Sequence, residues 1–191
     1  MKKLGLTGGI GVGKTYVSRV FQRMGIPIFN TDIEAKKCMV EDKGLIQSIK
    51  NSFGENIYDN NILQKEKLAK IVFNNSERLS ELNVLVHPIL NKKFYNWCEQ
   101  QTAKLVIKEA AILFESDAHL ELDAVICVSA TEEERIERVQ KRDGSSVAEI
   151  RNRMDKQMPQ SRKEELADFV ILNDGEQLLL PQLIRVLKGM E

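Results

Sequence analysis

The run of residues from Gly8 to Thr15 carries the clearest chemical signal in the sequence. It reads Gly-Gly-Ile-Gly-Val-Gly-Lys-Thr and satisfies the pattern G-x-x-x-x-G-K-[ST]. Glycines allow successive backbone N–H groups to turn toward phosphate oxygens, and a helix that starts at Gly13–Lys14 would add the positive end of its dipole. We expect Lys14 to reach the β- and γ-phosphates and the Thr15 hydroxyl to ligate Mg²⁺. The pattern therefore predicts a site for a nucleoside triphosphate, and a flexible glycine-rich turn is the alternative. The predicted phosphate-binding residues are Gly8, Gly9, Ile10, Gly11, Val12, Gly13, Lys14 and Thr15.

A carboxylate at Asp32 follows the next apolar segment, in the run Phe29-Asn30-Thr31-Asp32. In open parallel sheets ligands bind outside the carboxyl ends of the strands, which is where Asp32 is expected. There it would accept a proton from an acceptor hydroxyl or hold Mg²⁺. Alternatively, Asp32 caps the amino end of a helix over Ile33–Val40. The two roles are compatible with each other.

Residues 135–163 form a basic stretch in a chain that is otherwise neutral. The stretch contains nine lysines and arginines but only four acidic residues. Its segment Arg142–Ser146 interrupts the helical pattern like a hinge. Such a stretch would act as a lid that excludes water and presents guanidinium groups to the transferring phosphoryl group. We assign Arg142 to that chemistry, and an ordinary solvated helix face is the alternative.

Helix and strand patterns alternate around these candidate residues. The first helix after the glycine-rich run has apolar residues at Val17, Val20, Phe21 and Met24, which is the spacing of one buried face. Thr131 and Glu134 have the spacing of a capping box. Short continuous apolar runs, typical of strands buried on both faces, lie at residues 3–6, 26–29, 105–107, 125–128 and 169–172. The alternation predicts an α/β fold with a five-stranded parallel sheet flanked by helices.

The segment from about 40 to 101 departs from this alternation. It has an amphipathic helical pattern between Leu79 and Trp97, and no convincing strand. A helical insertion of this length is too long for a simple connection between elements. We therefore interpret it as a subdomain.

Composition and charge exclude several classes of protein. The 191 residues contain 28 basic and 28 acidic side chains, and 42% are hydrophobic, as in a globular domain. The zero net charge argues against a dedicated nucleic-acid binder. No apolar run is long enough for a membrane span, and the apolar start breaks at Thr7-Gly8-Gly9, unlike an export signal. Cys38, Cys98 and Cys127 lack C-x-x-C spacing, which argues against a disulfide framework or a zinc site. We expect a cytoplasmic protein that has neither membrane nor nucleic-acid partners.

Three classes of nucleotide-binding protein compete at this point. A GTPase switch should carry N-K-x-D and D-x-x-G motifs, but Asn91-Lys92-Lys93-Phe94 fails at its fourth position and no D-x-x-G is present. A motor or transporter ATPase would need a longer chain or a partner-binding signature. A small-molecule kinase needs a compact core, a place for the phosphate acceptor and a cationic lid, and the sequence offers all three.

The motifs, taken in order, resemble those of the dephospho-coenzyme A kinase family. The family's L-T-G-G-I-G-x-G-K-[ST] matches residues 6–15, its D-A-D element appears as Asn30-Thr31-Asp32, and its L-x-H-P matches residues 85–88. Its P-L-L-[FV]-E element resembles residues 111–115, its R-D element matches residues 142–143, a lid pattern ending in Gln matches residues 153–157, and its A-D-x-V-I-x-N-x-G close matches residues 167–175. The chain departs from these motifs at Asn30, where the family has Asp, and at Ala111, where it has Pro.

The resemblance implies an enzyme of the P-loop nucleoside-triphosphate-hydrolase fold. Such an enzyme uses ATP and Mg²⁺ to phosphorylate the ribose 3′-hydroxyl of dephospho-CoA, the last step of coenzyme A biosynthesis. It implies one kinase domain over residues 1–191, with an acceptor subdomain at about 40–101 and a lid at about 138–163. Asp32 takes the place of the family's catalytic aspartate, beside Lys14 and Arg142, and the nucleotide site extends to Tyr16 and Asn173. Another nucleotide or small-metabolite kinase is the alternative on the same scaffold, and a nucleotide-dependent binding switch is the rival from a different class.

Overall fold

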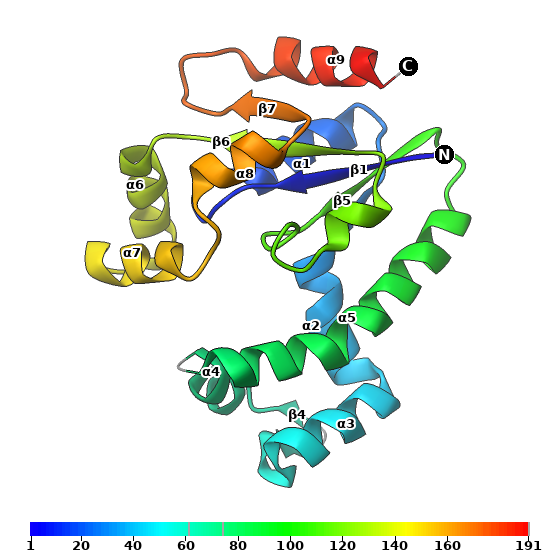
Figure 1. The fold of residues 1–191 in the computed structure, drawn as a ribbon, viewed down its shortest axis with the longest axis vertical. Coiled ribbons are helices and arrows are strands. Elements are labelled where there is room, and N and C mark those ends of the chain that lie inside the picture. The colour runs from blue at the N-terminus through cyan, green and yellow to red at the C-terminus, as the bar shows by residue number, and fades with distance from the viewer. Residues whose placement is uncertain (61, 74, 191) are drawn as a thin grey trace. The chain divides into compact units, whose positions relative to one another are not determined.

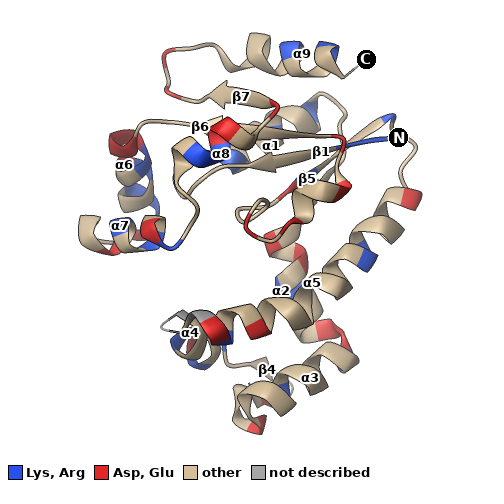
Figure 2. Ribbon diagram, in the orientation of Figure 1, with Lys and Arg blue, Asp and Glu red and all other residues tan. Residues whose placement is uncertain are grey.

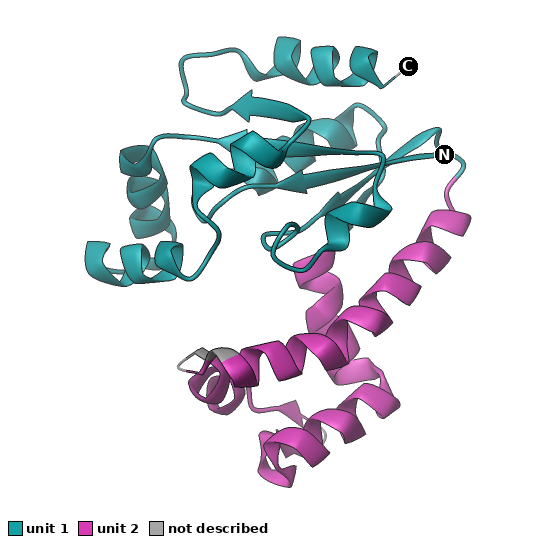
Figure 3. Ribbon diagram, viewed as in Figure 1, with its two compact units in different colours: residues 1–30, 102–191 teal, residues 31–101 magenta. Residues whose placement is uncertain are grey.

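The computed structural model describes residues 1–60, 62–73 and 75–190, which divide into two compact units (Figure 3). Unit 1 combines residues 1–30 with residues 102–191, and unit 2 consists of residues 31–101. Unit 2 is therefore a continuous stretch of sequence inserted into a discontinuous one.

The described part of unit 1 is built on a five-stranded parallel sheet, as the sequence predicts (Figure 1). The strand order, which the sequence did not predict, is β2-β5-β1-β6-β7. The central strand β1 (Lys2–Thr7) pairs with β5 (Leu105–Glu109) and β6 (Ala124–Ser129). The outer strands are β2 (Ile28–Asn30) and β7 (Phe169–Leu172). Because the strands are parallel, their carboxyl ends lie along one edge, and the glycine-rich run leaves β1 at that edge.

Two helices contribute to the main core of unit 1. Helix α1 (Lys14–Arg23) and helix α9 (Leu179–Gly189) contact each other, and each contacts a strand of the sheet. The core joins buried residues of both helices to Leu4, Leu6, Ile107, Ile126 and Val128 of the sheet. Pro181 is the third residue of α9, so this helix begins near its proline instead of kinking at it. A further short helix, η2 (Ala118–Glu121), precedes β6.

The basic stretch forms α6 (Glu132–Asp143), α7 (Val147–Asp155) and α8 (Gln160–Leu166). The predicted capping box of Thr131 and Glu134 is present at the start of α6, and Ser146 and Glu149 form a second one on α7. Gly144 ends α6 with a left-handed backbone, which explains the predicted break at residues 142–146. Ile136, Val139 and Ile150 form a small apolar cluster that joins α6 to α7.

Unit 2 has an apolar core of its own, with Leu45, Ile49, Val86 and Leu90 among its buried residues. Its helices are α2 (Thr31–Glu41), α3 (Lys43–Phe53), α4 (Lys65–Phe73) and α5 (Ser76–Glu99), with a short η1 (Glu55–Ile57). The expectation that this segment has no strand is wrong. Strands β3 (Tyr58–Asp59) and β4 (Ile62–Leu63) form an antiparallel pair, but strands this short leave no alternating pattern in the sequence.

No helix in the described part of the chain combines the length and the apolar character that a bilayer crossing requires.

Candidate active site

The glycine-rich run forms a loop between β1 and α1, and two of its glycines are required by geometry. Gly11 has a φ of +83°, and a Cβ atom there would lie 2.5 Å from the carbonyl oxygen of Arg135. Gly13, the residue before α1, has a φ of +92°, and its Cβ would lie 2.2 Å from the Asn173 amide nitrogen. A side chain at either position would push the loop away from α6 or from the end of β7. The motif therefore places backbone, not side chains, at this edge of the sheet.

The second half of the loop keeps its donors available. Among the described residues no protein acceptor receives the N–H groups of Gly11, Val12, Gly13 or Thr15, and no side chain caps α1. These donors lie at the amino end of α1, where the helix dipole favours an anion. The arrangement fits phosphate oxygens.

The Lys14 ammonium lies over the same loop, donating to the carbonyl oxygens of Gly8 at 2.7 Å and Gly9 at 3.1 Å. Thr15 and Tyr16 are exposed in the first turn of α1. The Thr15 hydroxyl is therefore accessible to a metal ion that arrives with a phosphate. Within the described residues, no group of three or more His, Cys, Asp or Glu side chains is arranged to hold a metal.

Asn173, predicted only through the family resemblance, contacts the phosphate loop directly. Its amide nitrogen donates to the carbonyl oxygen of Val12 at 2.8 Å. Arg138 of α6 donates to the carbonyl oxygen of Asn173 at 2.7 Å, and it pairs with Glu134 one turn earlier. Arg138 thus joins the lid region to the end of β7 beside the loop.

Arg142 is exposed at the end of α6 and binds its neighbour Asp143 through two hydrogen bonds of 2.6 and 2.8 Å. Arg153 of α7 donates to the same carboxylate at 3.0 Å. Hydrogen bonds from Arg142 and Arg153 hold the pKa of Asp143 well below its usual range. In this arrangement one carboxylate orients two guanidinium groups of the lid region.

Acidic side chains from outside residues 135–163 offset part of the positive charge that the sequence count gives to this stretch. Figure 2 shows basic and acidic residues side by side on α6, α7 and α8. Several acidic partners lie outside the window of residues 135–163, which is why the sequence count misses them. The pairs are Arg138–Glu134, Arg151–Glu132, Arg162–Glu165 and Lys163–Glu115.

Asp32 belongs to unit 2, where it lies exposed in the first turn of α2. The alternative that it caps a helix starting at Ile33 is wrong, because α2 already begins at Thr31. A carboxylate inside the first turn still interacts favourably with the helix dipole. Because Asp32 follows the last residue of β2 by two positions, it comes directly after a strand end, as predicted.

Sequence reasoning missed a buried carboxylate, Glu109, at the carboxyl end of β5. Glu109 pairs in register with Leu6 of β1, next to the start of the phosphate loop. Its Oε2 accepts hydrogen bonds from Ser18 at 2.8 Å and from Asn30 at 2.9 Å. The amide of Asn30, which stands where the family motif has aspartate, thus donates to Glu109, a contact that a charged aspartate could not make. The position of Glu109 at the end of an apolar run is the one feature of the sequence that could have indicated its role.

The other departure, Ala111, lies at a second buried ionic contact. Lys163 of α8 is fully buried, and its ammonium donates to the carbonyl oxygen of Ala111 at 2.7 Å. It also pairs with Glu115 at 2.8 Å, and Glu115 accepts the N–H of Met158 as well. The loop that the family begins with proline is therefore held here by a lysine from α8.

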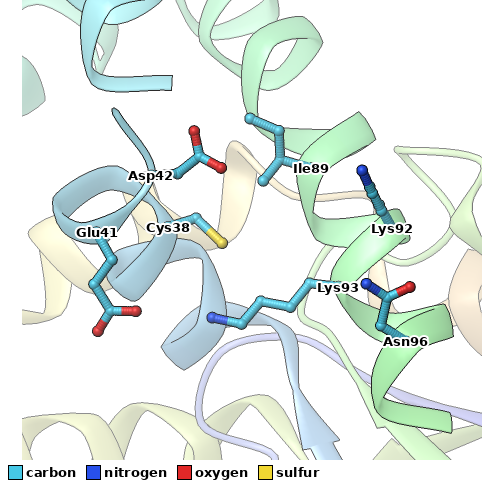
Figure 4. Close-up of a pocket in the computed structure, with 7 residues that line it drawn as sticks. All are labelled: Cys38, Glu41, Asp42, Ile89, Lys92, Lys93 and Asn96. Carbon is cyan, nitrogen blue, oxygen red and sulfur yellow. The ribbon is translucent and has the colours of Figure 1, made fainter. Parts of the chain in front are cut away.

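Unit 2 has a pocket of about 350 Å³ between α2 and α5 (Figure 4). Lys93 extends from α5 toward Cys38 of α2, and its ammonium pairs with Glu34 at 2.8 Å. Burial raises the pKa of Glu34, but hydrogen bonds from Lys37 and Lys93 outweigh it and leave that pKa lowered. Burial also raises the pKa of the Cys38 thiol, which opposes thiolate chemistry. The lining residues are Cys38, Glu41, Asp42, Ile89, Lys92, Lys93 and Asn96.

Comparison with known proteins identifies the family. The model of the dephospho-CoA kinase family matches residues 3–178. A dephospho-CoA kinase of Bacteroides fragilis is 37% identical over 186 residues, which cover 97% of this chain and 91% of that protein. A crystal structure from Thermus thermophilus superposes with a TM-score of 0.89 at 30% identity, covering 99% of this chain and 97% of the other. The dephospho-CoA kinase from Campylobacter jejuni shares the fold, with a TM-score of 0.70 at 24% identity and coverage of 100% and 98%. The expected α/β kinase fold is confirmed, and the chain belongs to the dephospho-CoA kinase family of ATP-dependent kinases.

Proposed function

We propose that the protein transfers the γ-phosphoryl group of ATP to the ribose 3′-hydroxyl of dephospho-CoA, giving coenzyme A and ADP. The observation that carries this proposal is the phosphate loop in a chain that matches the family over residues 3–178. Within the described residues, the N–H groups of Gly11, Val12, Gly13 and Thr15 have no protein acceptor. Phosphoryl transfer depends mainly on positioning and on neutralising charge, which a small number of fixed groups can supply.

The nucleotide site that we propose follows the loop from Gly8 to Tyr16 and includes Asn173. The available N–H groups would bind phosphate oxygens, and Lys14 would move from the loop carbonyls to the β- and γ-phosphates. Thr15 would hold Mg²⁺ together with those phosphates, since Mg²⁺ in such sites is bound largely by the substrate and water. The ion would neutralise charge on the phosphates when bound.

The acceptor side rests on Asp32 and on the helical subdomain at about 40–101. The Asp32 carboxylate would take the proton of the 3′-hydroxyl as the oxygen bonds to the γ-phosphorus and the bond to the β-phosphate oxygen breaks. The unit 2 pocket has donors in its wall at Lys92 and Asn96, but Glu41 and Asp42 line it as well, so its charge does not by itself select a phosphate. Arg142, on the lid at about 138–163, would stabilise the charge on the transferring group.

Acceptor profiling tests the proposal. Purified protein is given ATP, Mg²⁺ and one acceptor at a time, and ADP release is followed with dephospho-CoA, AMP, CMP and shikimate. We expect many turnovers on dephospho-CoA and background rates on the others. A preference for another acceptor would assign a different metabolite kinase. ADP formation that requires a protein partner would instead indicate a binding switch.

A further inference from the structure

The first half of the phosphate loop is bound by residues from the basic stretch. The N–H of Gly9 donates to Oε1 of Gln160 at 2.8 Å, and the N–H of Ile10 donates to Oε1 of Gln157 at 2.9 Å. Arg135, only 8% exposed, donates from Nε to the carbonyl oxygen of Ile10 at 2.9 Å. The peptide groups on both sides of Ile10 are thus held by side chains more than 120 residues away in the sequence.

Ile10 also has an apolar connection to the same stretch. Its side chain packs against the cluster of Ile136, Val139 and Ile150, which joins α6 to α7. Polar and apolar contacts therefore act on one residue of the loop. A displacement of α6 and α7 would be transmitted to Ile10.

Gln160 has a second function that only an amide can fulfil. While its oxygen accepts from Gly9, its nitrogen donates to the carbonyl oxygen of Val128 at 3.1 Å and to Glu164 at 2.8 Å. A side chain that donates and accepts at the same time bridges the loop to the end of β6. Gln157 lies in the connection between α7 and α8, and Gln160 is the first residue of α8, so both glutamines lie at the carboxyl end of the lid region.

The loop is consequently divided into two halves with different partners. Gly9 and Ile10 donate to the glutamines, whereas Gly11, Val12, Gly13 and Thr15 donate to no protein group in the described part of the chain. Fixing the first half limits the conformations of the second, because the two halves are consecutive residues of one short loop. Fewer conformations to restrict on binding means tighter binding.

We propose that Gln157 and Gln160 are positioning residues for the nucleotide. They hold Gly9 and Ile10 so that the following N–H groups are ready for the phosphates, and they couple the loop to the lid. The inference rests on the proposed binding of ATP at this loop, but it does not depend on which acceptor is phosphorylated.

Calorimetry with Mg²⁺ and ADP tests this role without any acceptor. Gln157→Met and Gln160→Met keep the side-chain length but remove the acceptor oxygen. One net hydrogen bond is worth about 0.5–1.5 kcal/mol, so we expect ADP affinity to fall by about 2- to 12-fold for each variant. Gln140→Met is the matched control, because Gln140 is exposed on α6, and its ADP affinity should equal that of the wild type.

Steady-state kinetics separate positioning from a loss of folded protein. We expect the KM for ATP to rise in Gln157→Met and Gln160→Met, while the KM for dephospho-CoA stays constant. A smaller folded fraction would instead lower the rate and change neither KM. If Gln160→Met fails to fold, Gln157→Met carries the test, since within the described residues its side chain makes one hydrogen bond to the loop.

Two results would overturn the inference. Unchanged ADP affinity in both variants would show that the glutamines do not prepare the loop. Tighter ADP binding would show that their oxygens occupy positions that phosphate must displace. Failure of the proposed function has a different signature, in which the wild type binds ADP but does not phosphorylate dephospho-CoA.

Discussion

Alanine at Gly11 is expected to displace the phosphate loop, and Gly25 provides an unusually close control. Both glycines have a φ of +83°, so both alanine variants incur the same left-handed backbone strain, about 1–2 kcal/mol. At Gly25 nothing lies within 4 Å of the added Cβ. At Gly11 the Cβ would lie 2.5 Å from the carbonyl oxygen and 2.8 Å from the Cα of Arg135, and these backbone atoms cannot rotate away. Such crowding costs about 1–3 kcal/mol more.

Urea unfolding measures the difference between the two variants. We expect Gly25→Ala to lower the free energy of unfolding by about 1–2 kcal/mol and Gly11→Ala by about 2–5 kcal/mol, with the same m-value. Both glycines belong to unit 1, so the same transition reports on both. The reduced entropy of the unfolded chain, which favours alanine, is common to the two variants and cancels in the comparison.

ADP affinity provides the functional half of this comparison. Gly11→Ala should weaken ADP binding by at least about tenfold, since moving the loop misplaces donors worth about 1.4 kcal/mol or more together. Gly25→Ala, at the end of α1 away from the loop, should bind ADP normally. Equal stability and equal ADP affinity in the two variants would refute the argument that close contact with α6 requires Gly11.

The remaining predictions concern single side chains. Lys14→Ala should lower kcat/KM by about 10²–10⁴-fold without changing Tm. Near-normal turnover would show that Lys14 does not bind the phosphates. Arg142→Lys should reduce kcat by at least about tenfold at unchanged dephospho-CoA affinity, because lysine lacks the planar fork; calorimetry that finds only weaker acceptor binding would make Arg142 a recognition residue. Asp32→Asn should reduce turnover about 10²-fold with normal ADP binding. Full activity of this variant would show that Asp32 is not the group that accepts the proton of the acceptor hydroxyl. Burial raises the pKa of Tyr58 to about 12, above its ordinary value of 10. The unfolded chain therefore loses this proton at a lower pH than the folded protein, and the free energy of unfolding should decline between about pH 10 and pH 12. Tyr58→Phe should remove that decline in pH-dependent unfolding, and an unchanged profile would contradict this assignment.

The parallel sheet could be predicted from the sequence because its signals are local. Each strand of this sheet overlaps a short apolar run, and β7 matches its predicted run from Phe169 to Leu172. The capping box at Thr131 depends on a residue only three positions away. Strands β3 and β4 have two residues each, which is a single period of alternation, so the sequence pattern did not reveal them.

The environment of the site could not be predicted because it is made by distant partners. The contacts of Gln157 and Gln160 with the phosphate loop span about 150 residues, and no periodicity encodes them. The partner of Asn30 is Glu109, which becomes its neighbour only when β2 pairs with β5. Local patterns thus identified the loop, whereas the side chains that hold it depend on tertiary structure.

The insertion of unit 2 between β2 and β5 sets the order in which the chain can assemble during synthesis. The central strand β1 leaves the ribosome first, yet its partners β5 and β6 begin at Leu105 and Ala124. At about 5–20 residues per second, β1 waits about 5–20 s for a neighbour. Unit 2 is continuous and has its own apolar core, so it can fold within that interval. Once folded, it replaces a long flexible loop by a fixed body, which lowers the entropy cost of bringing β5 to β1. Folding of the helical insertion in that interval would therefore help the strand that carries the phosphate loop to find its partner.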